Sequence, residues 1–212
     1  MTVAPTRLLV MGAVSTFEPV NGYQIRREMM SWNVQEWARI QPGSVYSALS
    51  TLTNKGHLER HDLIDGGREV AVYTTTVTGR TERNRQQGIA LETVDPYAPR
   101  AFQTGLALAP LMDRETFLDH LRRRREGLLC RQGEEERMVR ASIGAPPHVA
   151  PMIGHWQRMI AAELGWLEEL ITNVAEGHFE FAGERGSWQP APDDPSWALL
   201  AERERYQELI GR

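Results

Sequence analysis

The amino-acid sequence predicts a mainly α-helical protein with a small β-hairpin near the end of its first half. Apolar residues recur at helical spacing before residue 56, whereas residues 57 to 75 alternate around the turn signal Asp65-Gly66-Gly67-Arg68. Beyond residue 145, large apolar residues follow steps of three and four, as in a coiled coil. With 212 residues, 41% of them hydrophobic, the chain can bury a core in one domain or two small ones.

Composition favours a cytoplasmic protein. No run approaches the roughly 20 apolar residues of a membrane span, and the start lacks the features of a secretory signal. The lone Cys130 cannot form an internal disulfide, and we expect it to be buried and inert. The net charge is −4, yet residues 1 to 95 hold 10 basic and 10 acidic residues. This neutral first half disfavours a basic domain that coats nucleic acid indiscriminately.

The first half begins with three predicted helices. Residues 6 to 17, "TRLLVMGAVSTF", form a nearly all-round apolar helix, and Glu18-Pro19 breaks it. A second helix starts after Asn21 or Gly22 and runs through "YQIRREMMSW", where Tyr23 supplies an apolar contact. A third opens at Gln41-Pro42-Gly43-Ser44, with Ser44 as its cap. Gly56 ends this helix, whose residues Val45, Leu49 and Leu52 fall on one side.

A β-hairpin follows the third helix. The segments "HLERHDLI" and "EVAVYTTT" alternate on either side of Gly66-Gly67. Three short helices followed by such a hairpin make a winged helix-turn-helix, in which the third helix enters the major groove of DNA. Thr76 or Thr78 then caps a further helix through "GRTERNRQQGIALE".

The second half is predicted to be a helical unit. A short helix spans "RAFQTGLALAPLM", and Asp113 caps a long helix that runs to about Ile143. The expected domains are residues 1–90, residues 96–182, and a Pro-rich linker with a short C-terminal helix at 183–212. The last long helix needs a partner, either the Asp113 helix or a second chain. We expect its apolar stripe to mediate dimerisation; this dimerisation stripe comprises Val149, Ile153, Trp156, Ile160, Leu164, Leu167, Ile171 and Val174.

Three stretches of the first half resemble the PadR family of bacterial transcriptional regulators. These are "LLVMGAVSTFEPVNGYQIRREM", "IQPGSVYSALSTLTNKGHLER" and "GGREVAVYTTTVTG", which together cover about residues 6 to 85. The resemblance implies a homodimer that binds a double-stranded DNA operator, with a C-terminal helical dimerisation arm. It also implies repression that a small molecule relieves. After the tyrosine, the family often has Pro and then a basic residue within the helix, where this chain has Ser47, Ser50 and Thr51. The family's wing usually carries several basic residues, whereas here Arg68 is followed by Glu69, Val70 and Ala71.

A helix whose only cation is Lys55 can still contact DNA. Its free backbone amides attract a phosphate, short hydroxyls meet base edges or phosphates, and arginines of neighbouring elements clamp the backbone. The alternative is a winged-helix adaptor in which the hydroxyl face contacts protein. The predicted DNA contacts are Arg26, Arg27, Arg39, Gly43, Ser44, Tyr46, Ser47, Ser50, Thr51, Lys55 and Arg68.

The second half offers weaker candidates. Arg122-Arg-Arg-Arg125 has acidic neighbours, which predicts a solvated, salt-bridged face rather than a second DNA site. A site for a small aromatic or drug-like effector is a further hypothesis, against the alternative of ordinary core and dimer contacts. The candidate effector residues are Trp32, Met152, Trp156, Met159 and Trp166.

Enzymatic and metal sites lack support in the sequence. His57 with His61, and His148 with His155, have no paired cysteines and no His-Glu-x-x-His pattern. No Gly-x-Ser-x-Gly, phosphate-loop or Gly-x-Gly-x-x-Gly motif is present. We therefore expect no catalytic residues, no metal and no cofactor.

Overall fold

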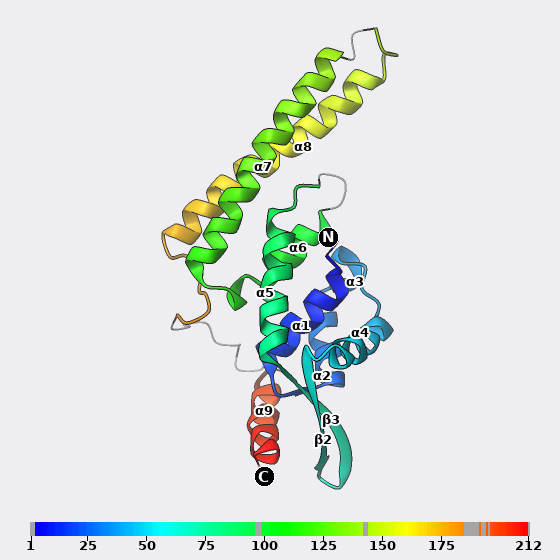
Figure 1. Ribbon diagram of the computed structural model, residues 1–212, viewed down its shortest axis with the longest axis vertical. Helices are drawn as coiled ribbons and strands as arrows, with labels where there is room; N and C mark the ends of the chain where they lie inside the picture. The colour runs from blue at the N-terminus through cyan, green and yellow to red at the C-terminus, as the bar shows by residue number, and fades with distance from the viewer. Residues whose placement is uncertain are drawn as a thin grey trace. The chain divides into compact units, whose positions relative to one another are not determined.

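The computed structural model describes residues 3–95, 99–141, 144–184, 191, 194 and 196–211. It divides into two compact units, and Figure 1 shows the elements of each. The winged-helix unit comprises residues 1–87 and 185–212, and the helical unit comprises residues 88–184. No helix in the described part of the chain is both long enough and apolar enough to cross a membrane.

The three predicted N-terminal helices are confirmed as α1 (Pro5–Phe17), α2 (Gly22–Ser31) and α4 (Pro42–Asn54). The start of α2 is a capping box, because Asn21 accepts from the Gln24 amide while the Gln24 side chain accepts from the Asn21 amide, each at 2.9 Å. A further short helix, α3 (Val34–Trp37), was not predicted from the sequence. It follows Asn33, whose φ of 60° lies in the left-handed region.

The predicted cap of α4 is wrong. The residue that precedes the helix is Gln41, and its side chain makes no capping hydrogen bond. Ser44 lies one turn inside, where its hydroxyl donates to the Gln41 carbonyl oxygen at 2.6 Å. Pro42, which has no amide hydrogen and a φ suited to the first turn, starts the helix instead. At the other end, Gly56 has a φ of 70°, which confirms it as the stop.

The predicted hairpin is confirmed as β2 (Leu58–Asp65) and β3 (Arg68–Thr75), which pair antiparallel. Gly66 and Gly67 form its turn, with φ values of 56° and 80°, as a tight hairpin turn with two positive φ angles requires. A third strand, β1 (Val20–Asn21), pairs with β3 to give the order β1-β3-β2. Two residues are too few to leave an alternating pattern, so the sequence did not reveal this strand.

The core of the winged-helix unit lies among α1, α4 and the sheet. Leu8, Leu9, Met11 and Val14 of α1 are fully buried, and the predicted inner face of α4 is buried as well. Helix α5 (Val77–Glu92) begins at Thr76, whose hydroxyl accepts from the Gly79 amide at 3.0 Å, as predicted. The last helix, α9 (Ser196–Ile210), lies beside α1, β1 and β2.

The helical unit contains α6 (Arg100–Ala107), a 3₁₀ turn at Ala109–Leu111, α7 (Arg114–Ala141) and α8 (Val149–Ala175). Asp113 accepts from the Thr116 amide at 2.9 Å, which confirms the predicted cap of α7. Helices α7 and α8 lie side by side (Figure 1). Of the two partners considered for the α8 stripe, the structure shows α7 of the same chain. The core they share includes Phe117, Leu118, Leu121, Leu128, Ile160, Leu164, Leu167 and Val174.

Two expectations for α7 are wrong. Cys130 is exposed rather than buried. Arg124 is not on a solvated face, because only 1% of its surface is exposed. Its guanidinium lies 3.5 Å from the centre of the Phe102 ring and 2.5 Å from Glu163. A run of four arginines on one helix points in every direction, so one of them enters the core.

Candidate nucleic-acid interface

Helix α4 has one buried side and one polar side. Val45, Ala48, Leu49 and Leu52 face the core, as the predicted spacing requires. Tyr46, Ser47 and Ser50 are exposed, whereas Ser44 and Thr51 are half-buried. The helix therefore presents a row of hydroxyl groups to solvent, on the element that a winged helix-turn-helix places in the major groove.

The start of α4 offers fewer free amides than expected. Pro42 has no amide hydrogen, and the Ser44 amide donates to the Gln41 carbonyl oxygen at 3.0 Å. Gly43 lies between them, and no heavy atom within 4 Å would meet a side chain placed there. A glycine in a helix costs stability relative to alanine, and nothing in the unit requires this one. Open space at a helix start suits the close approach of an anion.

The hydroxyl groups of α4 are not equivalent. Thr51 donates to the Ser47 carbonyl oxygen at 2.8 Å, and Ser44 is bonded in the same way to Gln41. Ser47 and Ser50 make no side-chain hydrogen bond within the described residues, so both remain available to a partner. The Tyr46 ring lies against Gly22, where an added Cβ would be 3.1 Å from Cε1 of the ring. This contact fixes the ring against the start of α2 and leaves 46% of the residue exposed.

The predicted phosphate clamps fall into two groups. Arg39, Lys55 and Arg68 are exposed, and none of them pairs with a carboxylate in the described part of the chain. Arg27 pairs with Glu28 at 3.0 Å, and Arg26 is half-buried with its guanidinium 5.7 Å from the Tyr23 ring centre. Arg39 has a φ of 57°, a conformation that bulky residues seldom adopt. The first group therefore offers charge to a ligand at little cost in broken contacts.

The wing carries one available cation. Arg60 donates to Asp62 at 2.7 and 2.9 Å, and this hydrogen bond raises the pKa of Arg60. Its charge is thus balanced on its own strand, whereas Arg68 stands at the hairpin turn without such a partner in the described residues. Ile64, near the same turn, is among the most exposed apolar residues of the described chain.

Sequence reasoning missed Tyr23 as a candidate contact. It was expected to be apolar packing, yet 58% of it is exposed on the first turn of α2, beside Arg26. The signal was available, because Ile25 and Met29 are four residues apart and Tyr23 falls off their side of the helix.

All four arginines of Arg122 to Arg125 have acidic partners. Arg122 pairs with Asp119, Arg123 with Glu92 and Arg125 with Glu168, at 2.9 to 3.0 Å. Burial lowers the pKa of Arg124, while Glu163 acts in the opposite direction. The carbonyl oxygen of Thr93 also accepts from Arg124 at 2.6 Å. Arg124 therefore links α7 to neighbouring elements in the core of the helical unit, whereas the other three arginines form exposed ion pairs that balance their charge.

The predicted effector residues lie on both units. Trp32 is half-buried in the winged-helix unit, with its ring 6.1 Å from that of Phe17. On α8, Met152, Met159 and Trp166 are exposed and Trp156 is half-buried. The Trp166 ring packs edge-on against Phe102 at 6.0 Å. An effector role for these residues stays a prediction.

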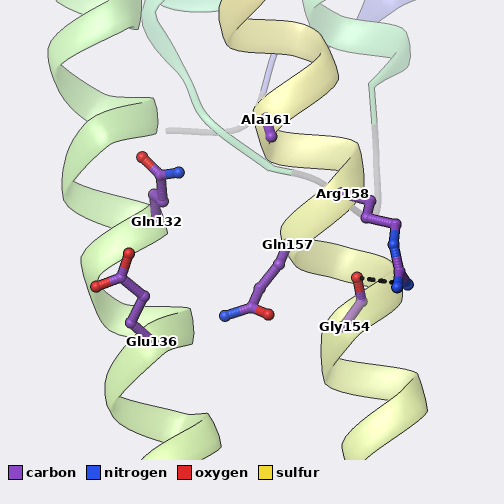
Figure 2. Close-up of a pocket in the computed structure, with 6 residues that line it drawn as sticks. All are labelled: Gln132, Glu136, Gly154, Gln157, Arg158 and Ala161. Atoms are coloured by element: carbon purple, nitrogen blue, oxygen red, sulfur yellow. Dashed lines mark hydrogen bonds between the residues drawn. The ribbon is translucent and has the colours of Figure 1, made fainter.

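A polar groove of about 360 Å³ lies between α7 and α8. Figure 2 shows Gln157 extending from α8 toward α7, while Arg158 turns back to the Gly154 carbonyl oxygen, 3.3 Å away. Gln132, Glu136 and Ala161 complete its lining. None of the predicted aromatic residues lines this groove, and its amide and carboxylate groups do not match a flat aromatic molecule.

The described histidines and carboxylates do not form a metal site. Within residues 3–95, 99–141 and the later described segments, no three His, Cys, Asp or Glu side chains lie together as a metal ion would need. His57 precedes strand β2, and His61 lies 2.9 Å from the Thr74 hydroxyl.

Comparisons with known proteins give one family and one solved structure to which the chain is similar. Residues 10–85 match the model of the transcriptional regulator PadR-like family. A solved structure, the crystal structure of Bacillus subtilis PadR in complex with operator DNA, is 18% identical, with 79% of this chain and 98% of that chain covered and a TM-score of 0.34. No curated protein matches the chain. Over residues 10–85 the chain is therefore similar to the transcriptional regulator PadR-like family.

Proposed function

We propose that the protein is a sequence-specific, DNA-binding transcriptional regulator. The observation that carries the proposal is the exposed side of α4, where Ser47 and Ser50 follow an unobstructed Gly43 within a PadR-like segment. A helix of this kind reads base edges with short polar side chains while its start meets a phosphate.

Electrostatics define how such binding behaves. Arg39 before α4, Lys55 at the end of α4 and Arg68 at the start of β3 supply three available cations per chain. In a dimer their number doubles, which gives affinity that falls steeply with salt. The neutral first half supplies little further attraction, so non-specific binding is weak and discrimination rests on the hydroxyl groups of α4.

We further propose that the chain forms a homodimer through the helical unit. Five residues of the predicted dimerisation stripe, among them Ile153 and Leu167, are already buried in the single chain. Met152, Met159 and Trp166 are exposed at intervals of seven residues, so they form a second stripe on α8. A second chain that covers this stripe removes three large apolar side chains from water. Analytical ultracentrifugation of Met159→Glu tests this, with a monomer as the expected species.

Repression relieved by a small molecule is the regulatory mode that we propose for this dimer. Supporting it are the aromatic and sulfur-containing side chains of α8, which suit an apolar ligand. Thermal denaturation of the protein with a panel of planar aromatic compounds provides the test. A ligand that raises the melting temperature and lowers DNA affinity in the same concentration range supports relief of repression.

The direct test is a fluorescence-anisotropy titration against the DNA upstream of the protein's own gene, at two salt concentrations. We expect saturable binding that resists scrambled competitor DNA and weakens with salt. A Ser47→Ala/Ser50→Ala variant should lose preference for the operator over scrambled DNA, because it removes base contacts and leaves the cations in place. Equal binding to scrambled and genomic DNA at both salt concentrations would instead favour a winged-helix adaptor that contacts protein.

A further inference from the structure

Helix α9 lies outside the segment that matches the PadR-like family, yet it packs on the winged-helix unit. It lies beside α1, β1 and β2, although more than a hundred residues separate it from each of them in sequence (Figure 1). A helix-turn-helix with a hairpin is complete without such an element. The contacts of α9 are therefore not needed to form the basic fold, and they must have another structural effect.

One side of α9 is anchored at the start of α2. Leu199 and Tyr206 are seven residues apart, so they share this side, and each is 2% exposed. The Tyr206 hydroxyl oxygen accepts from the Asn21 side chain at 3.0 Å. The Gln24 side chain donates to Glu202, one turn earlier on α9. Both partners form the capping box of α2, so α9 is attached at a defined point.

The same helix also contacts the wing. Arg205 lies 2.6 Å from the carboxylate of Asp65, the last residue of β2 before the hairpin turn. In the strand register, Asp65 lies opposite Arg68, the available cation of the wing, although the two side chains form no ion pair. The register of the strands places Asn21, Val72 and Asp65 on the same face of the sheet. Helix α9 therefore links the α2 start and the wing turn across one face.

The outer part of the wing needs such a support. Strand β1 pairs only with Val72 and Tyr73, so residues 62 to 71 form a two-stranded ribbon with its turn. Two-stranded hairpins are marginally stable on their own in water. Without a further contact, the turn that carries Arg68 would sample many positions relative to α4.

We propose that α9 is a brace that holds the wing in the orientation required for DNA contact. Tyr206 and Arg205 act as positioning residues: Tyr206 anchors the brace and Arg205 holds the wing turn. This inference rests on the proposed DNA-binding function, although its first consequence, an ordered wing, is a property of the free protein.

The first test measures amide hydrogen exchange in the full chain without DNA. A Leu199→Ala/Tyr206→Ala variant should detach α9 and accelerate exchange in residues 62 to 71 at least tenfold, with α1 and α4 unchanged. The matched control is Leu200→Ala/Gln207→Ala, which alters two exposed positions of the same helix. Equal exchange in the wing of both variants would refute the brace.

A milder variant distinguishes a local effect on the wing from unfolding of the whole unit. Arg205→Glu replaces a largely exposed side chain and places two carboxylates together at the wing turn. We expect roughly threefold faster exchange in residues 62 to 71 and none elsewhere, since a single exposed pair contributes little. Acceleration that spreads to α1 and α4 would indicate loss of the whole unit and count against a local brace.

The second test measures DNA binding by the same variants. Detaching α9 should weaken operator affinity about tenfold and reduce the slope of log affinity against log salt by about one per chain, because Arg68 no longer meets a phosphate. A mobile wing with unchanged affinity and slope would refute the role in DNA contact. If the unaltered protein binds no DNA, the proposed function fails, and the exchange experiment alone decides whether α9 orders the wing.

Discussion

Two groups of cations, one in each unit of the molecule, differ in how they are partnered. In the helical unit, Arg122 to Arg125 each have a carboxylate partner, and Arg124 is buried against Phe102. In the winged-helix unit, Arg39, Lys55 and Arg68 surround α4 without such partners in the described residues. In the longest arginine run, one member packs in the core and the other three form exposed ion pairs, whereas scattered single cations form the candidate interface. Local pairing, rather than the number of basic residues, therefore distinguishes the proposed nucleic-acid surface.

We expect the largest loss of stability when Arg124 is removed. Arg124→Ala should lower the free energy of unfolding by about 3 kcal/mol, because it deletes a buried cation and leaves Glu163 without its partner. Urea denaturation measures the loss. Arg122→Ala, which removes an exposed pair with Asp119, serves as the control and should change stability by less than about 0.5 kcal/mol. Equal losses in the two variants would show that burial of Arg124 does not distinguish it.

The corresponding change in the winged-helix unit is the triple variant Arg39→Ala, Lys55→Ala and Arg68→Ala. We expect operator affinity to fall roughly 100-fold and the salt slope to drop by nearly three per chain, with little change in stability. The control variant neutralises Arg122, Arg123 and Arg125, three cations that are already paired. Anisotropy titrations at several salt concentrations compare the two. An equal loss of affinity in the control would move part of the interface to the helical unit.

Two glycines with open surroundings, one in each unit, provide a matched pair of substitutions. A Cβ at Gly43 of α4 or at Gly165 of α8 would meet no heavy atom within 4 Å. Alanine at either position should therefore raise the free energy of unfolding by up to about 0.5 to 1 kcal/mol, because it lowers the entropy lost on folding. Only Gly43→Ala should weaken DNA binding, by about tenfold, since its methyl group would obstruct a phosphate at the helix start. Unchanged affinity for Gly43→Ala would exclude a close phosphate contact there.

The sequence predicted the helices and the hairpin well because their signals are local. The backbone preferences of Pro42, Gly56 and Gly66-Gly67 mark where helices and strands begin or end. The apolar residues of α8 recur at the spacing of an α-helix. The pairing of the candidate residues was not predictable, because it depends on tertiary neighbours. Nothing near Arg124 in sequence indicates Phe102, and nothing near Asn21 indicates Tyr206. The sequence pattern predicted the hydroxyl face of α4. Only the structure shows that the Thr51 hydroxyl is already hydrogen-bonded within the helix, whereas the Ser47 hydroxyl is available.

We expect the smallest effect at the ion pair between Glu82 and Arg85 of α5, a paired arginine that lies in the winged-helix unit. Arg85 donates twice to Glu82 at 2.7 Å, and this hydrogen bond lowers the pKa of Glu82 to about 2. Because the folded-state pKa lies below the unfolded value, the pair stabilises the protein above about pH 5, and the contribution disappears as the pH falls toward 2.

Glu82→Gln should therefore lower the free energy of unfolding at pH 7 by less than about 1 kcal/mol, since the pair is partly exposed to solvent. The difference from the unaltered protein should shrink between pH 5 and pH 3, as thermal denaturation at each pH would reveal. Asp119→Asn, at the exposed pair with Arg122, is the matched change in the helical unit and should have the smaller effect. If Glu82→Gln also left DNA binding unchanged, Arg85 would be a structural cation within the winged-helix unit itself. The winged-helix unit would then contain both paired arginines, such as Arg85, and cations that are unpaired in the described residues. Only the unpaired cations around α4 would belong to the candidate interface.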